Sequence, residues 1–170
     1  MIEVRQARPA DAGAVAEIYN QGILGRQATF ETRQRSAAEV LAWLKEPFPF
    51  LVAVDAVSGE VAGWVRGSTY RTRECYAGIA EFSIYVAEAW RRKGVGEALL
   101  AAFITAAEAA GSWKLLSRIF PENMASRRLC ARHGFREVGI YEKHGRLDGV
   151  WRDVVIVERL LPANLTMGPG

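Results

Sequence analysis

Residues Glu81–Leu100 read Glu-Phe-Ser-Ile-Tyr-Val-Ala-Glu-Ala-Trp-Arg-Arg-Lys-Gly-Val-Gly-Glu-Ala-Leu-Leu. The β-branched and aromatic residues 82–86 predict a strand, and the helix formers from residue 97 predict a helix that ends at Gly111. Between them lies a basic turn with two glycines, residues 91–96. A strand, a glycine-rich turn and a helix in this order leave outward-pointing backbone N–H groups at the helix start, where the helix dipole favours an anion. This stretch therefore predicts a phosphate-binding turn.

Three known phosphate-loop patterns can be compared with this turn. The dinucleotide fingerprint requires a third glycine where this chain has Leu99, and the nucleotide P-loop requires Lys where it has Glu97. The pattern Arg/Gln-x-x-Gly-x-Gly is satisfied by Arg91, Gly94 and Gly96. In this pattern the chain resembles the GCN5-related N-acetyltransferases (GNAT), which hold the pyrophosphate of acetyl-CoA in such a turn. The alternative is a solvated basic turn.

Length and composition restrict the class of protein. The 170 residues (18.8 kDa) fit one domain, which we place at 1–162, with a disordered tail at 163–170. The net charge of +3 is too small to indicate nucleic-acid binding. The two cysteines and two histidines lack metal-ligand spacing, so we expect no metal. There is neither a secretory signal nor an apolar run of the ~20 residues that span a membrane, so we expect a cytoplasmic protein.

Hydrophobic periodicity and turn residues predict the order β-α-α-β-β-β-α-β-α-β-β. This is an α/β protein with one mixed sheet and helices on both faces, and it matches the fold of the resembled family from end to end. The second predicted helix begins with a capping box, Ser36 and Glu39. We expect residues 20–35 to form a loop, 76–86 a strand, and 142–149 a polar segment between the last two strands.

The resemblance implies a binding site for acetyl-CoA. In the family, the pantetheine arm lies along the strand before the turn, and an Asn-x-x-Ser motif, here Asn123 and Ser126, contacts pantetheine and phosphates. Asn123 can also simply cap a helix, and one residue can do both. The predicted cofactor-binding residues are Ile84, Tyr85, Val86, Arg91, Arg92, Lys93, Gly94, Val95, Gly96, Glu97, Asn123 and Ser126.

A narrower resemblance concerns the phosphinothricin N-acetyltransferase group. It is carried by residues 28–32, 71–76, 81–86, 143–145 and 151–154. That group acetylates the α-amino group of glutamate-like phosphinates and of methionine sulfoximine. The run 142–159 resembles most closely the arsinothricin N-acetyltransferases. The resemblance implies antibiotic resistance by detoxification, and a homodimer with the C-terminal strands near the partner.

Two residues are candidates for the proton transfers. Glu81 aligns with the general base of the group, and its carboxylate would also attract the ammonium form of the acceptor. Alternatively, it is a glutamate at a sheet edge in solvent. A backbone N–H within 82–86 would stabilise the oxyanion, near a bulge that separates neighbouring strands. Where many relatives have a tyrosine or histidine as general acid, this chain has Cys130, and the alternative is a plain buried cysteine.

The acceptor would be bound by Arg71, Arg73, Phe30 and Tyr76, together with Glu81. The two arginines are two residues apart, so on an extended chain they project to one side, where guanidinium groups bind anions bidentately. Phe30 and Tyr76 would form an apolar wall. The alternatives are solvated arginines and aromatic core residues.

Other functions remain open. Acetylation of methionine sulfoximine, of other amino acids or of protein N-termini would use the same site, although paired arginines disfavour a basic peptide. A non-catalytic CoA-binding sensor would bind CoA without turnover of any amine. A nucleic-acid binder is disfavoured because the chain has no basic helix and no basic stripe interleaved with aromatic residues.

Overall fold

A computed structural model of the chain describes residues 1–166. Over these residues, seven strands form one mixed sheet in the order β1-β2-β3-β4-β5-β7-β6. The element order predicted from sequence is confirmed. The strands are β1 (Ile2–Gln6), β2 (Phe50–Asp55), β3 (Val61–Thr69), β4 (Ile79–Val86), β5 (Lys114–Ile119), β6 (Arg136–Leu147) and β7 (Val150–Leu160). The helices are α1 (Ala12–Leu24), α2 (Ala37–Trp43), α3 (Val95–Ala109) and α4 (Met124–Arg132).

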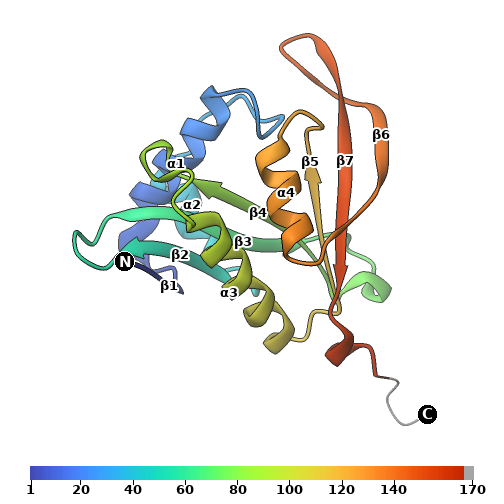
Figure 1. Cartoon of the computed structure of the whole chain (residues 1–170), viewed down its shortest axis with the longest axis horizontal. Helices are drawn as coiled ribbons and strands as arrows, with labels where there is room; N and C mark the ends of the chain where they lie inside the picture. The colour runs from blue at the N-terminus through green and yellow to red at the C-terminus, as the bar shows by residue number, and fades with distance from the viewer. Residues whose placement is uncertain (167–170) are drawn as a thin grey trace.

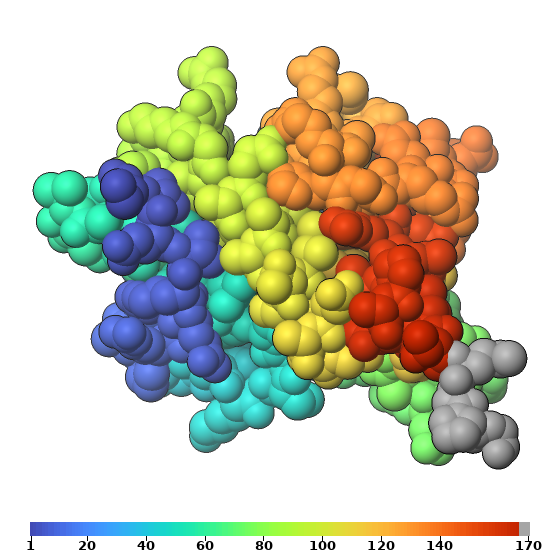
Figure 2. Space-filling model, turned by 60° about the horizontal axis from the view of Figure 1, so that its bottom comes forward, coloured from blue at the N-terminus to red at the C-terminus, as the bar shows by residue number. Residues whose placement is uncertain are grey.

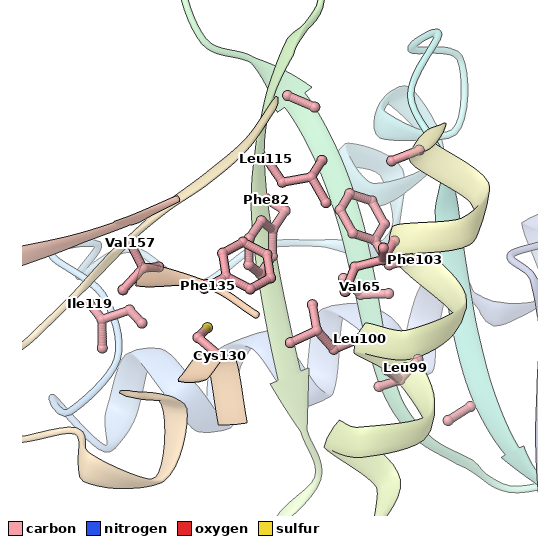
Figure 3. Close-up of a cluster of buried hydrophobic side chains, with 14 of the residues drawn as sticks. Val65, Phe82, Leu99, Leu100, Phe103, Leu115, Ile119, Cys130, Phe135 and Val157 are labelled. Atoms are coloured by element: carbon pink, nitrogen blue, oxygen red, sulfur yellow. The ribbon is translucent and has the colours of Figure 1, made fainter. Parts of the chain in front are cut away.

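Helices cover both faces of the sheet (Figure 1). On one face, Leu99, Leu100 and Phe103 of α3 are fully buried against the sheet (Figure 3). On the other face, α1 and α2 bury their apolar residues against Trp64. The capping box predicted at Ser36 and Glu39 is present and starts α2. None of the helices within residues 1–166 is long and apolar enough to cross a membrane.

Strands β4 and β5 separate soon after they begin. They pair in parallel only through Ile79–Glu81 and Lys114–Leu116. Ser117 marks the point of divergence, because its hydroxyl donates to the carbonyl oxygen of Phe82 over 3.0 Å. Beyond this point no strand within residues 1–166 pairs with the edge of β4 over 82–86 on the β5 side, so alternate backbone groups there are free to bind a ligand. This separation is what creates room for a ligand in the middle of the sheet.

The separation does not arise from a bulge in β4. The register between β3 and β4 runs without interruption from Gly63 opposite Val86 to Thr69 opposite Ala80. The bulge that the resemblance implied is therefore absent from this ladder within the described residues. Parallel pairing with β5 simply ends at Glu81, and the chain then leads from β5 into α4.

Two segments differ from the sequence prediction in the N-terminal half. Helix α1 continues to Leu24, although a loop was predicted from residue 20. The last turns of α1 are stabilised by burial of Ile23 and by two hydrogen bonds between the Asn20 side chain and the backbone of Arg35. Tyr76 lies in a 3-10 turn, Glu74–Tyr76, and not in β4. Tertiary contacts and a local turn thus override the periodicity at these positions.

The predicted polar segment 142–149 is mostly strand. Tyr141 pairs with Val154 and Gly145 with Arg152, so three residues of β6 oppose one residue of β7. The extra residues form a bulge, which is fixed by a 2.8 Å hydrogen bond from the Lys143 N–H to the Asp153 carboxylate. The pairing of two long strands outweighs the polar composition here.

The chain after β7 is anchored as far as it is described. Pro162–Asn164 form a 3-10 turn, and the Asn164 amide donates to the carbonyl oxygens of Glu108 and Ser112 over 2.8 Å each. Of the tail that we expected to be disordered, 163–170, Asn164 is therefore held against α3. Residues 167–170 lie outside the described residues.

Candidate active site

The glycine turn begins α3 in the way the sequence indicates. Gly94 is the residue before the helix, and its φ of 80° lies in the left-handed region, which favours glycine. Arg92 also has a positive φ, 59°. As at the start of any α-helix, the first N–H groups of α3 have no partner within the helix. The turn borders a cleft of about 940 Å³.

We refer to this hollow as the cofactor cleft. Figure 2 shows a notch at the top of the molecule between the yellow-green segment that leads into α3 and the orange segment of α4. The strand edge of β4, the glycine turn and α4 form its walls. The residues lining it include Gly22, Ala28, Ile84, Tyr85, Val86, Trp90, Arg91, Arg92, Gly94, Val95, Gly96, Glu97, Asn123, Ser126, Arg128, Leu129 and Arg132.

Arginines from two elements give the cofactor cleft its charge. Arg91 and Arg92 come from the predicted turn, whereas Arg128 and Arg132 come from α4 and were not predicted. Their four-residue spacing places them on one helix face, and that is the signal that could have identified them. Lys93 differs from the prediction, because it does not line the cleft and its ammonium lies 5.1 Å from the centre of the Trp90 ring.

Glu97 is the one carboxylate among the predicted cofactor residues, and its charge is balanced. Arg132 Nε and His133 Nε2 contact its two oxygens at 2.5 and 2.6 Å. Although burial acts in the opposite direction, the hydrogen bonds from His133 and Arg132 lower the pKa of Glu97. These contacts also tie the start of α3 to the end of α4.

The donor set of this cleft fits the pyrophosphate of acetyl-CoA. The free N–H groups at the start of α3 and the arginines around them bind anions, and the open edge of β4 offers backbone partners to an extended chain. Asn123 caps α4, since its side-chain oxygen accepts from the Ser126 N–H over 3.2 Å. Asn123 and Ser126 also line the cofactor cleft, so both interpretations of this motif are compatible with their position.

A second hollow, the acceptor cleft, adjoins the first. Its volume is about 500 Å³, and it shares Ala28, Ile84, Tyr85, Asn123, Ser126 and Leu129 with the cofactor cleft. It lies where β4 and β5 separate. The residues lining it also include Tyr19, Thr29, Phe30, Glu31, Glu81, Ser83, Ser117, Arg118, Phe120, Cys130, His144 and Val154. A reactive group held at Ile84 in the first cleft would therefore face the second.

The carboxylate of Glu81 lies in the acceptor cleft with 19% of its side chain exposed. Arg118 holds it, with Nε and Nη2 at 2.9 and 2.6 Å from the same oxygen, Oε1. The second oxygen, Oε2, makes no hydrogen bond to any residue among 1–166. Arg118 was not predicted, because its approach to Glu81 depends on the register between β4 and β5.

The apolar wall of the acceptor cleft consists of Phe30 and Phe120, which pack edge to face at 4.9 Å between ring centres. A Cβ on Gly145 would come within 2.8 Å of the Phe30 ring, so the β6 bulge packs directly against this wall. The bulge also brings His144 into the cleft. Phe30 was predicted at this site, whereas Phe120 and His144 were not assigned a role.

Arg71, Arg73 and Tyr76 do not line either cleft. Both arginines are exposed, the Arg71 guanidinium lies 5.2 Å from the ring centre of Tyr70, and Tyr76 packs against the same ring. The prediction assumed an extended chain, but the chain bends at Thr72 and Arg73 and then enters the 3-10 turn Glu74–Tyr76. The structure therefore places the predicted arginine pair outside the lining of the cleft that contains Glu81.

Cys130 is 2% exposed and packs in the core beside Phe135, as Figure 3 shows. Burial raises the pKa of its thiol to about 12. An ordinary thiol has a pKa of ~8.5, so proton transfer from Cys130 to a departing thiolate would be uphill. Its position favours a buried structural cysteine over a general acid.

We expect Cys130→Ala to retain kcat within about threefold, because a group with so high a pKa donates no proton at the rate-limiting step. The same substitution removes a buried sulfur and should lower the free energy of unfolding by about 1 kcal/mol. Steady-state kinetics and urea denaturation measure the two effects. A kcat reduced more than tenfold in a folded protein would instead identify Cys130 as a proton donor.

The clefts and their residues define the class of protein. An anion-binding helix start, an open strand edge and an adjoining cleft with a carboxylate are the parts of an acyl-CoA-dependent N-acyltransferase. Within residues 1–166, no cluster of His, Cys, Asp and Glu side chains could hold a metal ion. The chain belongs to the acetyltransferase (GNAT) family, whose profile matches residues 18–135. It is thus an N-acetyltransferase with acetyl-CoA as co-substrate.

Relatives cover nearly the whole chain. It is 34% identical over 165 residues to the phosphinothricin N-acetyltransferase of Streptomyces coelicolor, covering 94% of this chain and 96% of that protein. It is 33% identical over 159 residues to the L-methionine sulfoximine/L-methionine sulfone acetyltransferase of Pseudomonas aeruginosa, covering 91% and 92%. The crystal structure of a phosphinothricin acetyltransferase from Sinorhizobium meliloti with acetyl-CoA superposes with a TM-score of 0.88 at 30% identity, covering 94% and 88%.

Proposed function

We propose that this enzyme acetylates the α-amino group of a glutamate-like amino acid that carries an arsinate or phosphinate group. Arsinothricin is the favoured acceptor and phosphinothricin the second. The observation that carries the proposal is a small cleft, with Glu81 and Arg118 at one side, that adjoins the cofactor cleft along β4. Acetylation would remove the charge of the amine and thereby inactivate a toxic amino acid in the cytoplasm.

The preference for arsinothricin rests on the segment 142–159, which carries the resemblance to arsinothricin N-acetyltransferases. Two features support its relevance to the acceptor. His144 and Val154 line the acceptor cleft, and the β6 bulge packs against Phe30. The segment with the narrowest resemblance is therefore in contact with the region where the acceptor side chain would lie.

The chain's own residues would perform the proton transfer and the orientation. When bound, acetyl-CoA supplies the thioester. Glu81 would take a proton from the acceptor ammonium through its free Oε2, directly or through a water molecule. Backbone N–H groups of residues 82–86 on the open edge of β4 would stabilise the oxyanion. The second proton that the nitrogen loses on amide formation would reach the departing thiolate through water, since Cys130 is buried away from solvent.

Methionine sulfoximine is a second candidate. The relative from Pseudomonas aeruginosa is named as an acetyltransferase of this compound. Among the described residues that line the acceptor cleft, Arg118 is the only lysine or arginine. An acceptor with a single carboxylate and an uncharged side chain needs no second cation, so this lining suits methionine sulfoximine as well.

Release of free CoA, followed with a thiol reagent, tests the proposal with arsinothricin, phosphinothricin, methionine sulfoximine and glutamate in parallel. We expect kcat/KM for arsinothricin to exceed the other values by about tenfold, which corresponds to ~1.4 kcal/mol of transition-state binding. Equal rates with phosphinothricin would indicate a general phosphinate acetyltransferase. No release with any of the four would contradict the proposed acceptor class.

We also propose that the enzyme is a homodimer that pairs through β6. This strand is at the edge of the sheet, and exposed apolar side chains cover it and β7. These are Val138 (46% exposed), Ile140 (56%), Tyr141 (52%), Val150 (60%) and Trp151 (56%). A long apolar edge strand promotes uncontrolled association unless it is covered, and a second copy of the chain offers the complementary surface.

We expect light scattering to give twice the chain mass of 18.8 kDa for the wild type and the monomer mass for Ile140→Lys/Trp151→Glu. Charged side chains at these positions would be desolvated in the dimer, which opposes association. Val57→Lys is the matched control, since Val57 is 89% exposed in the β2–β3 turn. A wild type that remains monomeric, or a double variant that remains dimeric, would contradict this interface.

A further inference from the structure

Arg118 is the only arginine or lysine side chain that lines the acceptor cleft within residues 1–166, and the Glu81 pair uses only part of it. Nε and one N–H of Nη2 point to Oε1 of Glu81. A guanidinium has five N–H donors in one plane. The Nη1 group makes no hydrogen bond to any residue among 1–166, and 47% of the side chain is exposed.

The unused donors form a second binding edge. In a planar guanidinium, the Nη1/Nη2 edge has the geometry for a bidentate contact with a carboxylate, independently of the Nε/Nη2 edge. One guanidinium can thus lie between two carboxylates, with Glu81 on one edge and a ligand on the other. Such a ligand would be held beside Glu81, inside the acceptor cleft.

We propose that Arg118 binds the α-carboxylate of the acceptor and thereby places its α-amino group at Glu81. In an α-amino acid both groups are attached to one carbon atom, so fixing the carboxylate beside Glu81 brings the amine within reach of Oε2. Arg118 has two roles in this arrangement: it contacts the acceptor, and it positions the base. The inference rests on the proposed function and specifies which part of the acceptor is recognised.

This assignment differs from the expectation that Arg71 and Arg73 bind the anionic groups of the acceptor. Those two residues are exposed and outside both clefts, whereas Arg118 is already at the base. Strand geometry accounts for its position. Glu81 pairs in parallel with Leu116, and Arg118 follows two residues later, so it projects to the same face of the sheet as Glu81. The divergence of β4 and β5 after this pair opens the space that the acceptor would enter.

The test compares phosphinothricin and arsinothricin with the amines formed by removal of their α-carboxylates. For the wild type we expect kcat/KM for each acid to exceed that for its amine by at least tenfold. In Arg118→Met, kcat/KM for the acids should fall by about 10- to 100-fold, as expected for loss of a charge-assisted bidentate contact. The preference for acid over amine should fall below about threefold, because the amines never use this contact.

Arg136→Met is the matched control. Arg136 holds Glu158 Oε1 through Nε and Nη2, like Arg118 and Glu81, but lines neither cleft. Arg136→Met should leave the preference for acid over amine unchanged. Arg118→Lys should keep only part of that preference. If the wild type reacts and Arg118→Met retains the preference for the acids, the inference is wrong and the proposed function stands. If the wild type acetylates no amino acid, both are wrong.

Discussion

Replacing Glu81 with glutamine should lower kcat by about 10²- to 10⁴-fold, the usual contribution of a general base. The amide has the size of the carboxylate and still offers an oxygen to Arg118, so the cleft keeps its shape. It cannot take a proton from the acceptor ammonium. The KM for acetyl-CoA should change little, since Glu81 lies in the acceptor cleft and not in the cofactor cleft.

Steady-state rates with saturating acetyl-CoA measure this effect, and thermal unfolding verifies that the variant is folded. Glu137→Gln is the control, because Glu137 makes a similar pair with Arg127, at 2.7 and 2.9 Å, away from both clefts. It should keep the wild-type kcat. A Glu81→Gln enzyme with full kcat would exclude Glu81 as the base.

Gly94→Val should raise the KM for acetyl-CoA by about 10- to 100-fold, since a β-branched residue in the left-handed region costs about 1–3 kcal/mol. A Cβ at Gly94 would meet no atom within 4 Å, so the cost is in the backbone alone. The turn would relax to another conformation, and the N–H groups at the start of α3 would no longer converge on the pyrophosphate. The binding of CoA can be measured directly by calorimetry.

Gly59→Val separates this effect from general destabilisation. Gly59 has a φ of 75° and equally open surroundings, but it lies in the β2–β3 turn. It should reduce stability like Gly94→Val and leave the KM for acetyl-CoA unchanged. Gly94→Asn should be close to wild type, because asparagine tolerates the left-handed region. Unchanged CoA affinity in Gly94→Val would show that this turn does not hold the cofactor.

Local signals in the sequence were sufficient to predict the order of the elements. Each of these signals lies within a few consecutive residues: the β-branched run at 82–86, the capping box at Ser36 and the glycines at 94 and 111. The errors arose where distant contacts decide the structure. Burial of Ile23 prolongs α1, and pairing with β7 turns the polar run 142–147 into strand.

The cofactor cleft was more predictable than the acceptor cleft for the same reason. Its turn is continuous in sequence, so Gly94 and its neighbours could be recognised as a motif. The acceptor cleft combines β4, β5, the loop with Phe30 and the β6 bulge. Arg118 reaches Glu81 only through the β4–β5 register, which no sequence motif specifies. Arg71 and Arg73 appeared suitable because the 3-10 turn beside them was not anticipated.

Identification of the reaction product tests the central claim most directly, namely that an amino-acid acceptor reacts in the cleft beside Glu81. The wild-type enzyme would be incubated with acetyl-CoA and arsinothricin, and the products examined by mass spectrometry and NMR. We predict one acetyl group on the α-nitrogen for each CoA released, and almost none with Glu81→Gln. Tight binding of CoA without any acetylated amino acid from the acceptor panel would contradict the account and favour a CoA-binding sensor.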